Sequence, residues 1–258
     1  MTLPGTPLPD LRAYPHLEAE EVAALVAESG SREELLKVQD LWRAKHLRDV
    51  NAMAIYTMLM DTDDLIGAAY ASGDIAGFQA LLARRISWFS LPLERCALVQ
   101  PPLALDMQLT SLALGDTETA RRWAMEAVEK GDAETDDGEA IKILSQAFTA
   151  AVGRRYAELL RLCSQLEQLW AGRRTGQFMG KTAITIARAL LAVQNRDAEA
   201  LGVALDFRQK FLVGWWTKYA AVDRAAALFD VTGQAILALA AREGLACRGN
   251  VFSDPAFL

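Results

Sequence analysis

The sequence of 258 residues predicts an all-α protein of stacked antiparallel helical hairpins, arranged as an irregular α-solenoid or a helical bundle. Ala (45) and Leu (37) together are more than twice as frequent as Val, Ile and Thr combined (36), and β-branched residues lose rotamer freedom in helices. Apolar residues recur every three or four positions, as one buried helix face requires. Polar turns recur about every 40 residues, a period that suits stacked helix pairs.

The N-terminal part predicts a leader followed by a long helix. Residues 1–17 are rich in proline and are expected to be loosely ordered. Ser31 and Glu34 have the spacing of a capping box, in which two side chains satisfy the free amides of a first helical turn. The apolar pattern that follows continues to Ala52–Leu59 and predicts a helix that breaks near Asp61–Asp64.

Four short turns then separate the Ala/Leu-rich helical patterns: Ser72–Asp74, Gly115–Asp116, Gly153–Arg154 and Asn195–Asp197. Glycine or asparagine can take the left-handed conformation that ends one helix, and a following aspartate can cap the next. The alternative is an irregular bundle whose hairpin lengths happen to agree. Because no glycine-rich or serine-rich linker is present, residues 18–258 are expected to form a single domain, with a tail at 245–258.

The composition favours a cytoplasmic protein without a disulfide framework. The three cysteines, Cys96, Cys163 and Cys247, are far apart and odd in number, so they are interpreted as small buried apolar residues. The first residues do not have the pattern of a secretory signal, and the apolar runs are too short to span a membrane.

The net charge of −6 is distributed unevenly, with −12 in residues 1–140 and +6 in residues 141–258. Two acidic clusters stand out as candidate partner-binding residues: Asp61, Asp63 and Asp64, and then Asp132, Glu134, Asp136, Asp137 and Glu139. Such a surface attracts a basic protein and repels nucleic acid and anionic membranes. The alternative is an ordinary solvated helix surface.

The aromatic segment Phe211–Tyr219 adds Trp215 and Trp216 to the candidate partner-binding residues. Tryptophan is favoured at protein interfaces because it buries a large area with few rotatable bonds. Adjacent residues on a helix point about 100° apart, so one of the two is expected at a surface or crevice. The alternative is that they pack between neighbouring helical units.

Motifs for catalysis or cofactor binding are weak. Gly176–Thr182 has one residue too few between its glycines for a phosphate loop, and Thr175 or Gly176 is better interpreted as a helix start. The run from Asp132 lacks the glycine and glutamate that a calcium loop requires. His16 and His46 belong to no catalytic motif, and no cofactor or metal is expected. The third alternative is an enzyme whose carboxylates are brought together in space by the fold.

The C-terminal part, Asp230–Leu245 followed by a tail ending Ser253–Leu258, resembles the all-helical immunity protein forty-nine family of bacterial polymorphic-toxin systems. This resemblance implies a cytoplasmic protein that binds a cognate toxin and neutralises it by occluding its active surface, and it implies no catalytic residues. If the toxin is basic, the acidic clusters would imitate its anionic substrate. The alternative is a helical-repeat adaptor that binds a peptide or helix in a concave groove.

The residues of this C-terminal part also predict its local structure. Arg242 and Gly244 suit a helix end, since a cation stabilises the negative end of the helix dipole and glycine can turn left-handed. Phe252 and Phe257 are expected to fold the tail back as apolar anchors.

Overall fold

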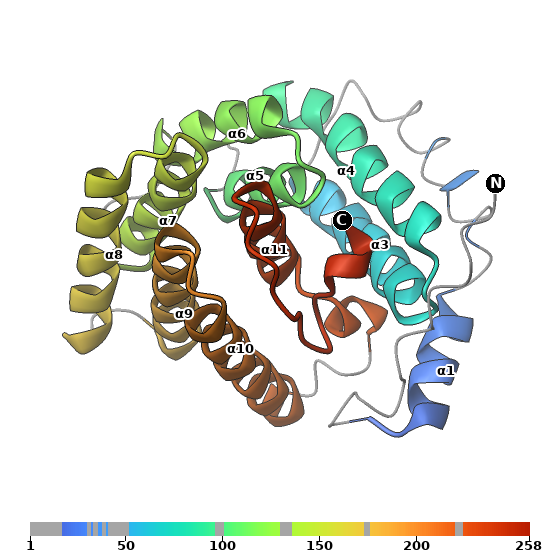
Figure 1. Cartoon of the computed structure of the whole chain (residues 1–258). Coiled ribbons are helices and arrows are strands. Elements are labelled where there is room, and N and C mark those ends of the chain that lie inside the picture. Colours follow the sequence, from blue (N-terminus) through green and yellow to red (C-terminus); the bar gives the residue numbers. More distant parts are fainter. Residues whose placement is uncertain are drawn as a thin grey trace. The chain divides into compact units, whose positions relative to one another are not determined.

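The structure is a computed structural model that describes residues 17–29, 32, 36–37, 40, 52–95, 101–129, 136–172, 176–219 and 224–258. Most of these residues lie in helices (Figure 1), and within these ranges the only extended pairing is a single antiparallel bridge between Asn250 and Ser253. The predicted all-α fold is confirmed. Residues 1–16 of the expected leader, and the expected capping box of Ser31 and Glu34, lie outside the described residues.

The described residues form two compact units, each assembled from segments that are far apart in the sequence. Unit 1 consists of the described residues in Met1–Leu98, Trp216–Asp230 and Phe257. Unit 2 consists of the described residues in Val99–Trp215, Val231–Ala256 and Leu258. The expectation of a single domain over residues 18–258 stays a prediction.

Unit 1 is organised around helix α3. Its elements are α1 (Ala19–Glu28), α3 (Ala52–Ala71), α4 (Ile75–Arg95) and the 3₁₀ helix η3 (Ala225–Leu228). Helix α3 packs against each of the other three elements. Four aromatic rings join this core, with neighbouring ring centroids 4.6–5.9 Å apart: Tyr70, Phe78, Phe229 and Phe257. Ring pairs at such distances stabilise a core beyond the area that they bury.

Helix α3 continues through Asp61–Asp64, so the predicted helix break near these residues is wrong. The helix continues because Thr62 and Leu65 on the same stretch are buried in its packed face. Gly67, further along α3, lies against η3, and a Cβ atom at this position would clash with the backbone carbonyl group of Ala225. The close approach of η3 to α3 therefore requires glycine.

Unit 2 contains the stacked hairpins. Its helices are α5 (Pro101–Ala113), α6 (Thr117–Glu129), α7 (Asp136–Val152), α8 (Tyr156–Ala171), α9 (Gln177–Asn195), most of α10 (Ala198–Tyr219) and α11 (Val231–Arg242). From α5 to α9 each helix packs on the next, and α7 also contacts α5 and α9 (Figure 1). Helix α11 packs on α5 and α9. One continuous apolar core gathers residues from α5 to α11.

The four predicted turns are confirmed, and they share one geometry. Each ends a helix with one residue in the left-handed conformation: Gly73, Gly115, Arg154 and Arg196. In each turn the next backbone N–H donates to a carbonyl five residues earlier, which is the Schellman pattern of a helix end. In three turns an aspartate then accepts a backbone N–H of the following helix at 2.9–3.0 Å: Asp74, Asp116 and Asp197.

Two of these turns place the left-handed residue one position later than expected. Arg154 and Arg196 have φ of 55° and 54°, and Gly153 and Asn195 precede them. A residue with a Cβ atom pays about 1–2 kcal/mol for this conformation, so the hydrogen bonds of the turn must offset it. The expected helix start is confirmed, because Gly176 is the N-cap of α9 and Lys181 lies inside that helix.

The C-terminal tail is held by specific contacts, as expected from its phenylalanines. Arg242 ends α11, and Gly244 follows with φ of 69°. Phe252 is fully buried, and Phe257 lies in the short 3₁₀ helix η4 (Pro255–Phe257) and joins the aromatic core of unit 1. Within unit 2, Asn250 Nδ2 donates to a backbone carbonyl of α10 at 2.9 Å.

One apolar stretch, Ala225–Arg242, is long and apolar enough to cross a membrane by length and composition alone. This window is 67% buried inside the protein. The observation is a weak indication of a membrane span, because a buried core helix meets the same criterion.

Candidate functional site

The first acidic cluster lies on α3, where arginines of unit 1 bind two of its carboxylates. Asp63 Oδ1 lies 2.9 Å from Nη2 of Arg85, whose side chain is only 5% exposed. Asp64 Oδ2 lies 2.6 Å from Nη2 of Arg224, and Asp64 Oδ1 accepts the backbone N–H of Ala226 at 2.9 Å. These contacts hold α4 and η3 onto α3. That Asp63 and Asp64 bind a partner stays a prediction.

Asp61 lies one turn before Asp64 and is half-buried. Burial raises the pKa of the Asp61 carboxyl group, the positive charge of Arg224 opposes this rise, and the negative charge of Asp64 adds to it. Partial removal from water disfavours the ionised form of a carboxyl group. The carboxylates of Asp61 and Asp64 are therefore close enough to influence each other. The enzyme alternative requires a pair of neighbouring carboxylates of this kind.

The second acidic cluster surrounds the start of α7 and is described only in part. Three of its members have no described side chain: Asp132, Glu134 and Asp136. Asp137 is exposed, and its Oδ1 accepts the backbone N–H of Gly176, the N-cap of α9, at 3.0 Å. Glu139 is half-buried. The carboxylate of Asp137 therefore stabilises the junction of two helix starts, where negative charge is favourable.

Trp215 and Trp216 lie near the end of α10, and both side chains are half-buried. The Trp215 ring packs against Phe178 of α9, with centroids 4.9 Å apart, and against Phe211, with centroids 6.3 Å apart. The alternative of packing between neighbouring helices therefore describes Trp215. Whether Trp216 contacts a partner stays a prediction.

An apolar stripe runs along α10 and ends beside these tryptophans. Its members recur every four residues: Val203, Phe207, Phe211, Trp215 and Tyr219. Residues four apart are neighbours on a helix surface, but each step turns by about 40°, so the stripe winds around α10. Phe211 is buried, but Val203 is 65% exposed and Phe207 is 40% exposed. The stripe therefore leaves the core in the first half of the helix and presents apolar side chains to solvent.

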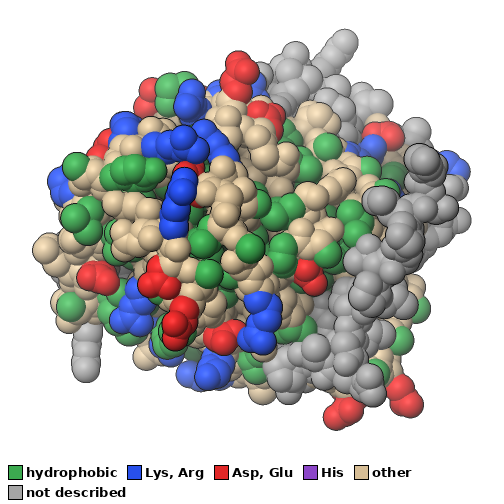
Figure 2. All heavy atoms as spheres, viewed as in Figure 1, with side chains coloured by type: hydrophobic (Ala, Val, Ile, Leu, Met, Phe, Trp, Pro, Cys, Tyr) green, Lys and Arg blue, Asp and Glu red, His purple; other side chains and the backbone are tan. Residues whose placement is uncertain are grey.

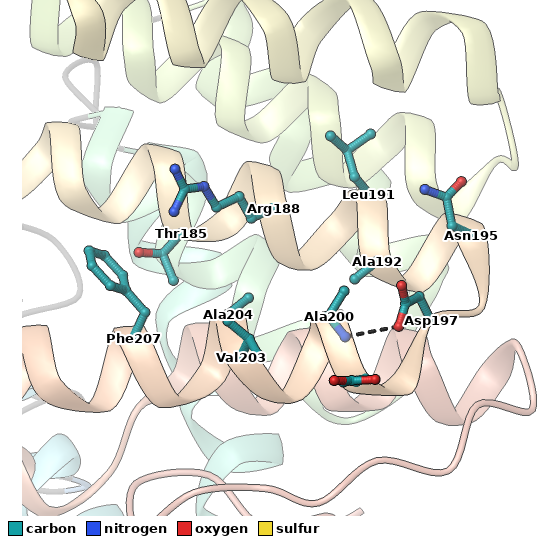
Figure 3. Close-up of a pocket in the computed structure, with 11 residues that line it drawn as sticks. Thr185, Arg188, Leu191, Ala192, Asn195, Asp197, Ala200, Val203, Ala204 and Phe207 are labelled. Atoms are coloured by element: carbon teal, nitrogen blue, oxygen red, sulfur yellow. Dashed lines mark hydrogen bonds between the residues drawn. The ribbon is translucent and has the colours of Figure 1, made fainter.

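The exposed half of the stripe borders a cavity of about 550 Å³ between α9 and α10 (Figure 3). Its walls come from both helices of this hairpin, which the turn at Arg196 joins. We name the cavity the α9–α10 groove and define it by Thr185, Arg188 and Leu191 on α9 and Val203 and Phe207 on α10. Figure 3 shows Arg188 on α9 and Phe207 on α10, on the two walls of the groove.

The charge of the side chains differs between the two ends of the groove. Arg188 is exposed on the α9 wall, and Lys181 lies seven residues before it, with Nζ 5.6 Å from the centroid of the Phe211 ring. A cation at this distance from an aromatic ring is attracted to it. At the other end, Asp197 caps α10 and Glu199 lies beside it in the lining. Arg188 is therefore the basic residue of the lining, Lys181 extends the positive charge beyond it along α9, and the end near the turn is acidic.

These groove residues were not among the sequence candidates. The aromatic segment was recognised only from Phe211 onward, so Val203 and Phe207 were missed. The signal that identifies them is the four-residue repeat over the whole of α10, which extends the stripe toward the N-terminus of the helix. No pattern in the sequence marks Arg188, because its importance depends on the spacing of two helices.

A second cavity, of about 490 Å³, lies among α6, α7 and α8. Three arginines line it: Arg121, Arg155 and Arg161. Figure 2 shows Lys and Arg side chains gathered over α6 and the turn between α7 and α8. Arg155 forms an ion pair with Glu158 at 2.7 Å, and Arg161 donates to Gln165 at 3.1 Å. Neither cavity is lined by Asp61, Asp63 or Asp64.

The cysteines and histidines add little to the site. Cys163 is buried, as expected, and burial raises the pKa of its thiol to about 12. Cys247 is only half-buried, while Cys96, His16 and His46 lie outside the described residues. Among the residues that the structure describes, no group of three or more His, Cys, Asp or Glu side chains is placed to hold a metal ion.

No known protein family, curated protein or solved structure matches this chain. The resemblance to the immunity protein forty-nine family therefore stays a prediction. What the fold and site define is a class: an all-α protein that presents an exposed apolar groove with a basic wall in one helical hairpin.

Proposed function

We propose that this chain is a cytoplasmic bacterial immunity protein that binds a cognate toxin and occludes its active surface. The observation that carries the binding role is the α9–α10 groove, where Val203 and Phe207 are exposed beside Arg188. Exposed apolar side chains bordered by charged groups are typical of protein interaction sites. The resemblance of the C-terminal part supplies the class of partner.

The groove has the rigid support that a binding surface needs. On the opposite side of α10 from Val203 and Phe207, the helix buries Leu201, Leu205 and Leu212. The tail adds hydrogen bonds to the same helix, from Asn250 to the carbonyl of Leu205 and from the Val251 backbone to the Gln209 side chain. A preorganised helix loses little entropy on binding, which favours tight association.

We also propose that the toxin is basic. This part of the proposal rests on the net charge of −6 of the present chain. Charge on the whole surface accelerates the encounter of two proteins, while buried apolar contacts slow their dissociation. We therefore assign steering to the acidic surplus and specific contact to the groove.

Co-expression with the product of the adjacent reading frame tests the proposal. We expect the wild-type chain to restore growth and to form a complex, and the double substitution Val203→Glu and Phe207→Glu to abolish both, because it places two charges on the contact surface. Leu160→Glu is the matched control, since Leu160 is a comparably exposed apolar residue on α8. A wild-type chain that neither protects the cell nor binds that product would contradict the proposal.

The same groove favours a second candidate, a helical-repeat adaptor for a peptide or helix. Grooves between helices bind amphipathic helices through apolar side chains at helical spacing. Calorimetry separates the two functions: an adaptor binds several short segments weakly, whereas an immunity protein binds one neighbour-encoded partner with very high affinity.

A further inference from the structure

We propose that the α9–α10 groove receives an amphipathic helix of the partner protein that carries carboxylates seven residues apart. This inference deepens the proposed function and depends on it. It identifies the chemistry of the segment that is seated in the groove: apolar side chains against Val203 and Phe207, and acidic side chains against Lys181 and Arg188.

The apolar wall indicates a helix as the occupant. Val203 and Phe207 are four residues apart, so they present two contacts about 6 Å apart along the axis of α10. Leu191 adds an apolar side chain to the lining from α9. A third helix lying along the hairpin can place residues at the same three-to-four-residue spacing between these walls. The volume of about 550 Å³ accommodates such side chains rather than a whole helix.

The charges specify which face the ligand helix presents. Lys181 and Arg188 are seven residues apart on α9, so their positions are two turns, or about 10.5 Å, apart along the helix. A ligand helix aligned with α9 places two of its own residues at this separation when they are also seven apart. Carboxylates at these two positions would pair with both cations, while lysines there would be repelled.

The acidic end of the groove orients this ligand. Asp197 and Glu199 lie near the turn, so a carboxylate of the ligand is disfavoured there and a cation is favoured. The expected helix therefore has a basic end near the α9–α10 turn and its two acids further along. This local pattern is compatible with a toxin that is basic overall.

The described C-terminal tail of this chain does not fill the groove. Its two phenylalanines, Phe252 and Phe257, are buried elsewhere, and the tail residue Asn250 contacts the backbone of Leu205, on the side of α10 that faces the core. Val203 and Phe207 consequently keep their exposure in the presence of the tail.

Selection from a phage-displayed helix library on the full-length protein tests the inference. The library fixes an apolar stripe on a helical scaffold of about five turns and varies two positions seven apart among Glu, Lys and Ser. We expect Glu to be enriched over Lys at both positions by about tenfold, the discrimination of one good ion pair with its hydrogen bonds. On Arg188→Glu, the preference at one of the positions should reverse to Lys. Arg161→Glu, an equal change of charge on α8, should leave the selection unchanged.

Enrichment of Lys on the wild-type protein, no enrichment at either position, or a preference that Arg188→Glu leaves unchanged would each overturn the inference. Protection of toxin-expressing cells by the wild-type chain, measured beside the selection, distinguishes the two proposals. If the selection fails while the wild-type chain protects cells, the proposed function stands and the helix inference fails. If the selection succeeds while the wild-type chain protects no cell, the groove binds helices but the immunity role fails.

Discussion

The acidic segment of α3 and the apolar stripe of α10 both mark unusual residues in the sequence, but the structure uses them in opposite ways. Asp63 and Asp64 are polar residues turned toward arginines of unit 1, where they hold elements together. Val203 and Phe207 are apolar residues turned toward solvent. Residue type alone therefore does not show how strongly a segment is engaged inside the protein.

The two segments differ in how far along the sequence their contacts lie. Arg224 follows Asp64 by 160 positions, so nothing near Asp64 in the sequence shows that its charge is neutralised. The α10 stripe, in contrast, depends only on the four-residue repeat within one helix. The repeat can be read from the sequence, but only the packing of α10 shows that Val203 and Phe207 are exposed while Phe211 is buried.

The largest expected effect is on the free energy of unfolding, and it differs between Gly67 on α3 and Gly202 on α10. Gly67→Ala should lower the free energy of unfolding by about 3 kcal/mol, because the added Cβ forces η3 away from α3 and overpacks this junction. Chemical denaturation followed by circular dichroism measures the change.

Gly202→Ala on α10 is the matched control, since no atom lies within 4 Å of the position that its Cβ would occupy. Alanine there should raise stability by about 0.5–1 kcal/mol by favouring the helix. If both substitutions had the same sign, the close contact between α3 and η3 would not be the feature that requires glycine.

A smaller contrast is expected between the two candidate binding segments themselves. Asp64→Ala should cost about 2 kcal/mol, because it leaves Arg224 and the Ala226 N–H without their acceptor in a partly buried place. Phe207→Ser should cost less than about 1 kcal/mol, since this ring is already 40% exposed. Thermal denaturation of both variants tests this order, and the reverse order would contradict the assignment of Asp64 to structure and Phe207 to the surface.

The fold was largely predictable from sequence because its signals are local. The capping aspartates Asp74, Asp116 and Asp197 and the left-handed Gly115 mark helix ends that the structure confirms. The left-handed Arg154 was not predictable, since the hydrogen bonds of its turn and its ion pair with Glu243 offset the cost of that conformation. The groove depends on how α9 and α10 lie against each other, which no residue pattern encodes, so the sequence candidates include none of the residues that define it.

The smallest expected effect distinguishes Asp61 from its neighbour Asp64. The folded protein raises the pKa of Asp61 above its ordinary value of 3.8, so the folded state binds this proton more tightly than the unfolded state does. Ionised Asp61 therefore opposes folding above the raised pKa, and the penalty disappears as the pH falls below 3.8.

Asp61→Asn should stabilise the protein by a few tenths of a kcal/mol at neutral pH, with an advantage that fades in acid. Urea midpoints of this variant and the wild type, compared from pH 7 to about pH 3, measure it. An Asn variant that is less stable at neutral pH would mean that Asp61 is held by Arg224 as firmly as Asp64 is, and the whole α3 cluster would then belong to the scaffold.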